Sequence, residues 1–91
     1  IDFDQHRVTR GGQLVDLTPT EFRLLRALIE KTGDAISEAQ LHETVWGEPL
    51  SNNAGYVRRY IWFLRQKLEP DPAHPRLIHT IRGVGYTLRA H

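Results

Sequence analysis

The feature that most restricts the fold of this chain is an amphipathic segment ended by prolines. Its apolar residues recur at spacings of four, three and four, which places them on one face of a helix over residues 54–68: Val57, Ile61, Leu64 and Leu68. Three prolines then prevent the helix from continuing: Pro70, Pro72 and Pro75. Two strand patterns follow, Leu77–Ile81 and Tyr86–Leu88, joined by a glycine-containing turn. A helix with one buried face therefore precedes a C-terminal β-hairpin.

A first helix is predicted upstream by its capping signals. Thr18 is an N-cap residue, Pro19 occupies the first helical position and Glu21 completes a capping box. Gly33 can take the left-handed conformation that ends a helix. We expect this helix to run from Pro19 to about Thr32.

A second helix is predicted between the first helix and the amphipathic segment. Ser37 as N-cap and Gln40 form another capping pair, and Leu41 and Val45 share an inward face. The helix should end near Trp46–Gly47.

The order of the elements predicts the fold class. Residues 1–17 alternate weakly around Gly11–Gly12, which predicts two or three short antiparallel strands. Short strands, three helices and a β-hairpin packed beside the third helix form an α+β, winged helix-turn-helix arrangement. The second and third helices would be the helix-turn-helix, and the hairpin would be the wing. We expect one domain over residues 1–91.

Composition excludes several classes of protein. The 91 residues suffice for a single small core, and the apolar and charged fractions of 40% and 25% are ordinary for a globular domain. No cysteine is present, which excludes disulfides and cysteine chemistry, and no apolar run approaches the ~20 residues of a membrane span. The lack of cysteine permits an intracellular protein without proving it, and we expect a cytoplasmic one. Since the chain begins at Ile1 and contains no methionine, we expect it to be an excised domain.

Charge is distributed unevenly along the chain. The net charge is only +1, but residues 1–54 carry five basic and nine acidic side chains, a balance of −4. Residues 55–91 carry seven basic and two acidic side chains, a balance of +5. Contact with phosphates requires local rather than global positive charge, so the C-terminal part is the candidate nucleic-acid-binding side.

Three separated blocks carry a family resemblance: Leu17–Leu25 (LTPTEFRLL), Leu64–Glu69 (LRQKLE) and Ile78–Tyr86 (IHTIRGVGY). In this order they resemble the effector domain of OmpR/PhoB-type response regulators, and the resemblance covers essentially the whole chain. It implies a transcription-regulating domain that binds double-stranded DNA at direct-repeat promoter sites as a head-to-tail dimer. It also implies a parent protein with an N-terminal phosphorylatable receiver domain, which this chain lacks.

Arginines on the third helix and the wing are the first candidate DNA contacts. Arg58 and Arg59 open the exposed face of the helix, where one would bind guanine and the other a phosphate, although a solvated helix face suits them equally well. Arg82 beside the glycine turn is expected at or in a minor groove, and its alternative is simple exposure at the turn.

Two further candidates depend mainly on the resemblance. Arg65 matches a family position that contacts phosphate, and a salt bridge to Glu69 one helical turn later is the compatible alternative. Thr80 is expected to bind a phosphate through its hydroxyl, with ordinary strand packing as the alternative.

Trp62 and Phe63 depart from the family pattern, which has polar or basic residues there. Trp62 would contact thymine methyls, sugars or a neighbouring protomer, or pack against Tyr86 or Leu88, and Phe63 is expected on the wing. The aromatic pair keeps a second function open, in which the domain is a protein-interaction module with weak or no DNA readout and these two side chains are its hot spots.

The loop before the third helix is a candidate contact for RNA polymerase, as the resemblance implies, through Glu48, Pro49 and Leu50. A plain connector is the equal alternative.

Enzymatic and metal chemistry find no support in the sequence. His42–Glu43 begins an H-E-x-x-H pattern, but Trp46 replaces the second histidine, so we expect His42 on the surface and no zinc site. Gly83-Val84-Gly85 opens no helix, so it is no nucleotide-binding loop. We expect no enzyme activity and no cofactor.

Overall fold

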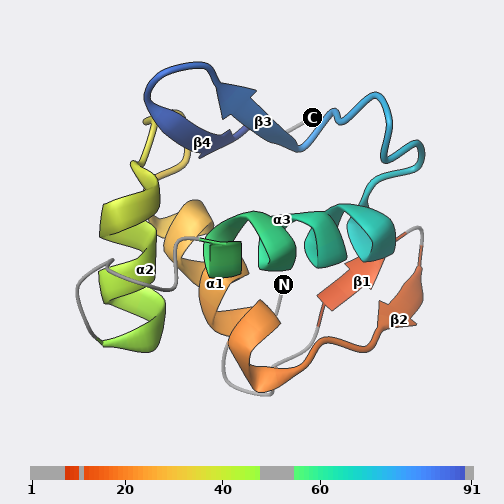
Figure 1. The fold of residues 1–91 in the computed structure, drawn as a ribbon. Helices are drawn as coiled ribbons and strands as arrows, with labels where there is room; N and C mark the ends of the chain where they lie inside the picture. The colour runs from red at the N-terminus through yellow and green to blue at the C-terminus, as the bar shows by residue number, and fades with distance from the viewer. Residues whose placement is uncertain (1–7, 11, 48–54, 90–91) are drawn as a thin grey trace.

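Two antiparallel hairpins flank three helices in the computed structural model, which describes residues 8–10, 12–47 and 55–89 (Figure 1). The elements occur in the following order: β1 (Val8–Arg10), β2 (Gln13–Val15), α1 (Pro19–Glu30), α2 (Glu38–Trp46), α3 (Gly55–Leu68), β3 (Ile78–Ile81) and β4 (Gly85–Leu88). The predicted α+β winged-helix architecture is confirmed. None of the helices in the described ranges is long and apolar enough to cross a membrane.

The capping box of α1 is present as predicted. The Thr18 hydroxyl accepts from the Glu21 amide over 3.2 Å, and the Glu21 carboxylate accepts from the Thr18 amide over 2.9 Å. The helix ends at Glu30, two residues before the expected Thr32. The Thr32 hydroxyl and amide both donate to the Ile29 carbonyl, which makes a tighter turn, and Gly33 follows at φ 92°.

Helix α2 begins and ends where the sequence predicts. The Ser37 hydroxyl accepts from the Gln40 amide over 3.1 Å. Gly47 closes the helix at φ 76°, a left-handed conformation that strongly favours glycine. The expectation that His42 lies on the surface is wrong, because its side chain is fully buried.

The apolar stripe of α3 forms the centre of the core. Its four predicted residues are all buried: Val57, Ile61, Leu64 and Leu68. They pack in one cluster with Leu24 and Leu28 of α1 and Leu41 of α2, none of which is exposed to solvent. Each fully buried aliphatic side chain stabilises the fold by about 1.5–3 kcal/mol, so the stripe positions α3 firmly.

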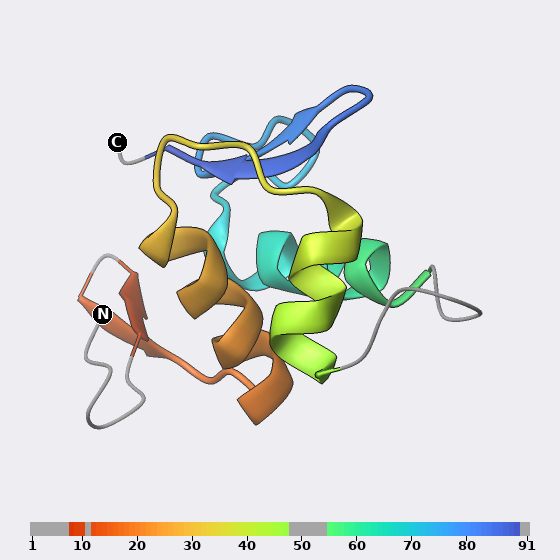
Figure 2. The same cartoon turned by 90° about the vertical axis from the view of Figure 1, so that its left-hand side faces the viewer.

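The C-terminal hairpin is attached to the helices through the α1–α2 connection. Strands β3 and β4 pair with Ile78 opposite Leu88 and Ile81 opposite Gly85. Ile36 adds an isolated bridge to Tyr86, with hydrogen bonds of 2.8 and 2.9 Å. Figure 2 shows this connection running beside the hairpin. The wing is therefore fixed to the helices along β4, the strand that contains Tyr86.

Glu69 closes the proline-rich segment between α3 and β3. Its carboxylate is buried and accepts four hydrogen bonds of 2.8–3.1 Å from the amides of Arg76, Leu77 and Ile78. These bonds satisfy backbone donors that would otherwise be buried without partners. The carboxylate thus sets the point at which β3 begins.

Candidate nucleic-acid interface

The tip of the wing and the first turn of α3 lie at the same end of the molecule (Figures 1 and 2). Between them is a cleft of about 440 Å³, lined by Glu38, Arg58 and residues 80–86. Three elements contribute to the cleft: the start of α2, the start of α3 and the wing. The structure thereby brings the predicted candidates Arg58, Thr80 and Arg82 together.

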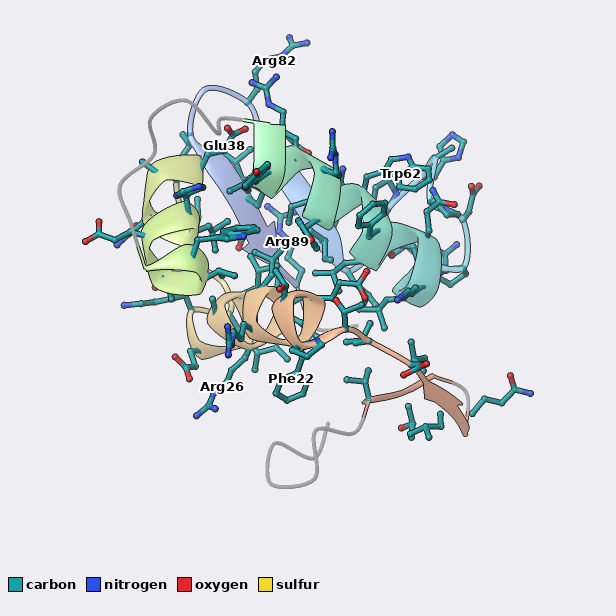
Figure 3. The ribbon with its side chains drawn as sticks, turned by 60° about the horizontal axis from the view of Figure 1, so that its bottom comes forward. Phe22, Arg26, Glu38, Trp62, Arg82 and Arg89 are labelled. Carbon is teal, nitrogen blue, oxygen red and sulfur yellow. The ribbon has the colours of Figure 1, made fainter. Side chains whose placement is uncertain are left out.

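Arg58 is held by a carboxylate that sequence reasoning missed. Its Nε donates to Oε1 of Glu38 over 3.0 Å, while 76% of the arginine side chain is exposed. The hydrogen bond and charge of Glu38 raise the pKa of Arg58. Glu38 lies beside the first turn of α3 in Figure 3. In the sequence it is an ordinary acidic residue of a helix's first turn, so nothing there indicates a partner 20 positions away.

Arg59 and Arg82 are exposed cations. Neither forms an ion pair within the described part of the chain, and Arg82 extends from the wing into solvent (Figure 3). Gly83 follows Arg82 at φ 78°, which permits the tight turn at the tip. Both positions agree with the exposure expected from the sequence.

Arg65 and Thr80 contact each other. Nη2 of Arg65 donates to the Thr80 hydroxyl over 2.8 Å and to the Ile78 carbonyl over 3.1 Å. The guanidinium also lies 5.9 Å from the centre of the Tyr86 ring. The alternative prediction, a salt bridge from Arg65 to Glu69, is wrong. In the described structure the Glu69 carboxylate accepts hydrogen bonds from backbone amides instead. The role of Arg65 and Thr80 at phosphates stays a prediction.

Trp62 is the largest exposed apolar side chain of α3, at 56% exposure. Its ring centroid lies 5.6 Å from that of Phe63, which lies 5.4 Å from that of Tyr60. We expected Phe63 on the wing, but these ring contacts lie within its own helix. The alternative interpretation of Trp62, partial burial against Tyr86 or Leu88, is not supported by its 56% exposure.

His42 belongs to an aromatic cluster between α2 and α3. It stacks on Trp46 at 5.1 Å and on Tyr56 at 6.3 Å. Trp46 replaces the second histidine of the metal-binding pattern and serves here as a packing partner. No group of three or more potential metal-ligating side chains occurs among the residues that the structure describes.

The polymerase-contact candidates Glu48, Pro49 and Leu50 lie outside the described residues. Their role stays a prediction.

Sequence comparison relates the chain to transcriptional regulators. A family model described as "Transcriptional regulatory protein, C terminal" matches residues 12–88. The KDP operon transcriptional regulatory protein KdpE of Escherichia coli (strain K12) is 43% identical over 86 residues, which is 94% of this chain and 38% of that protein. Response regulator MprA of Mycobacterium avium (strain 104) is 44% identical over 89 residues, 98% of this chain and 39% of that protein. The chain thus spans about two fifths of the length of these relatives.

Structure comparison finds DNA-binding domains. The RstA DNA-binding domain of Klebsiella pneumoniae, solved in complex with the RstA box, superposes with a TM-score of 0.92 at 28% identity over 100% of this chain and 90% of that one. The DNA-binding domain of CpxR from E. coli superposes with a TM-score of 0.84 at 29% identity, covering 99% and 88% of the two chains.

Proposed function

The chain belongs to the family of C-terminal domains of transcriptional regulatory proteins, as an effector domain of the OmpR/PhoB type, and from this we propose that it binds double-stranded DNA sequence-specifically and regulates transcription. In this proposal α3 enters the major groove and the wing reaches an adjacent minor groove.

One observation carries the proposal: exposed arginines of α3 and of the wing lie at the same end of the molecule, and Arg58 and Arg82 line the same cleft. Arg58 and Arg59 come from the start of α3, and Arg82 comes from the wing tip. Clustered cations repel one another, and a polyanion relieves that repulsion. A helix and a hairpin with this charge fit the major groove and the neighbouring backbone of a duplex.

The solved relatives support the same proposal. The RstA domain was crystallised with its RstA box, and the DNA-binding domain of response regulator AdeR with an intercistronic region. The AdeR domain superposes with a TM-score of 0.80 at 28% identity. We infer a comparable duplex site for this chain.

The wider context is also proposed. Since this chain covers 38% of KdpE and 39% of MprA, we propose that it is the effector part of a longer response regulator with a receiver domain. Binding as a dimer to direct repeats in the cytoplasm, without catalytic activity, is consistent with that assignment. Contact with RNA polymerase through Glu48, Pro49 and Leu50 belongs to the same proposal.

Selection from a library of random duplexes tests the function. We expect one enriched motif, with binding to the enriched duplex that weakens steeply as salt rises. Equal, salt-independent affinity for enriched and unselected duplexes would refute sequence-specific DNA binding.

The exposure of Trp62 favours a second candidate, a protein-interaction module. A large exposed apolar side chain contributes strongly to an interface once a partner covers it. In that case Trp62→Ala would abolish partner binding or self-association, and the selection would enrich no motif. A Trp62→Ala protein that still selects the wild-type motif would place Trp62 outside base readout.

A further inference from the structure

We propose that Glu38 is a positioning residue that presents the end of the Arg58 side chain for recognition of a guanine in the major groove. The inference rests on the proposed DNA-binding function and adds the chemistry of one contact. It concerns a residue of α2 rather than of the helix that would read the bases.

The Glu38–Arg58 contact leaves the two terminal guanidinium nitrogens of the arginine available for a base. Glu38 binds the Nε nitrogen of Arg58 at 3.0 Å, near the base of the guanidinium. Among the described residues, neither terminal nitrogen of Arg58 has a hydrogen-bond partner. These two nitrogens form the fork that matches O6 and N7 of guanine.

Glu38 is itself held in place from the wing. Its side chain is 23% exposed, and its Oε1 accepts a second hydrogen bond, from the Tyr86 hydroxyl at 3.4 Å. Tyr86 is anchored in turn by two backbone hydrogen bonds to Ile36. The carboxylate therefore has a position that α2 and the wing define together, whereas the 76% exposed Arg58 has no other support in the described structure.

The location of Glu38 argues against a role in general affinity. A carboxylate in a cleft that faces DNA repels phosphates, so it weakens non-specific binding. The Glu38–Arg58 contact therefore reduces non-specific affinity for DNA. Because it also orders the long arginine side chain, it should increase the preference for the cognate base over other bases. Without Glu38, Arg58 would have to be ordered when it binds the base. The entropic cost of immobilising one long side chain corresponds to a loss of about 2- to 12-fold in preference for the cognate base.

The proposal is tested by selection from random duplexes with wild type, Glu38→Ala and Glu43→Ala. Glu43 lies on the exposed side of α2, so its substitution makes the same charge change away from Arg58. We expect Glu38→Ala to reduce guanine preference at one position of the motif about 2- to 12-fold, with non-specific affinity equal or higher. Glu43→Ala should keep the preference. An unchanged motif in Glu38→Ala would overturn the inference.

Two further variants exclude a merely structural effect. Arg58→Lys keeps the charge and removes the fork, so it should lose preference at the same position. In an Arg58→Ala background, Glu38→Ala should have no additional effect on base preference, because the carboxylate acts through the arginine. A full additional effect there would overturn the proposal. Thermal unfolding of each variant identifies any protein that fails to fold. If Glu38→Ala does not fold, Glu38→Gln, which keeps the side-chain shape and removes the charge, replaces it in the same comparison.

The same experiment separates this inference from the proposed function. If wild type selects no motif, DNA recognition itself fails and the inference fails with it. If wild type selects a motif and Glu38→Ala selects the identical one, only the role of Glu38 is refuted.

Discussion

Nη2 of Arg65 donates a hydrogen bond to the hydroxyl of Thr80 over 2.8 Å and thereby joins α3 to the wing. The same nitrogen donates to the Ile78 carbonyl over 3.1 Å. Both side chains were predicted from the sequence as DNA contacts, and in the free domain they fix the wing relative to the helix. A phosphate that approaches Thr80 would meet a hydroxyl already oriented by an arginine.

We expect Arg65→Met to lower the free energy of unfolding by about 1.5–3 kcal/mol, because it removes two charge-assisted hydrogen bonds and keeps most of the apolar stem. Thr80→Val removes one partner and should cost about 1 kcal/mol. Urea denaturation of both single variants and the double variant measures the coupling. A double variant whose loss equals the sum of the single losses would show that the contact contributes nothing.

Gly85 and Gly83 should respond very differently to alanine. A Cβ atom at Gly85 would lie 1.9 Å from the Ile36 carbonyl oxygen, whereas one at Gly83 would meet nothing within 4 Å. The Ile36 backbone cannot move away without weakening its two hydrogen bonds to the Tyr86 backbone. Gly85→Ala should therefore destabilise the domain by about 3 kcal/mol or more. Gly83→Ala should cost about 1–2 kcal/mol, from its left-handed φ alone. Equal melting temperatures for the two variants would contradict this close approach.

The Glu21–Lys67 pair should make stability depend on acid pH. Burial alone would raise the pKa of Glu21, but the Lys67 ammonium at 2.6 Å and the Thr18 amide lower it overall to below its ordinary value. A carboxyl with a lowered folded-state pKa stabilises the fold above its unfolded pKa, and this stability is lost as pH falls through the folded value.

Glu21→Gln should thus lower the free energy of unfolding by about 1 kcal/mol at pH 7 and by clearly less near pH 3, measured by urea denaturation. Glu30→Gln is the control, because Glu30 pairs with Arg26 on the exposed side of α1. A Glu21→Gln deficit that is constant from pH 7 to pH 3 would show that the charge of Glu21 is not responsible.

The residues that the sequence predicted correctly are those whose signals are local. The capping box at Thr18, the stop at Gly47 and the apolar stripe of α3 each depend on neighbours within a few positions. Two contacts that the sequence did not predict join side chains to partners distant in sequence. Glu38 accepts a hydrogen bond from Arg58, 20 residues later, and the buried Glu69 carboxylate accepts hydrogen bonds from backbone amides seven to nine residues later.

His42 illustrates why burial of a polar residue is hard to predict. Its position beside Leu41 on a short helix gave it no clear apolar face, so the surface was the default expectation. Trp46 stacks on the ring from one turn later in α2, and the packing of α2 against α3 adds Tyr56. Site residues depend on such tertiary contacts more than elements do, because elements follow from periodicity and caps.

Arg82 should contribute to DNA affinity through charge rather than base recognition. Figure 3 shows Arg82 and Arg26 projecting from opposite sides of the molecule, so Arg26 supplies a matched control for removal of one positive charge. Arg82→Ala should weaken binding to all duplexes by a similar factor and reduce the slope of log affinity against log salt by about one unit. Arg26→Ala should leave the slope at the wild-type value, because its exposed pair with Glu30 is remote from the wing. Fluorescence anisotropy across a salt series measures both slopes. Identical slopes for Arg82→Ala and wild type would remove the wing tip from the phosphate-contacting surface and leave α3 as the basic element of the interface.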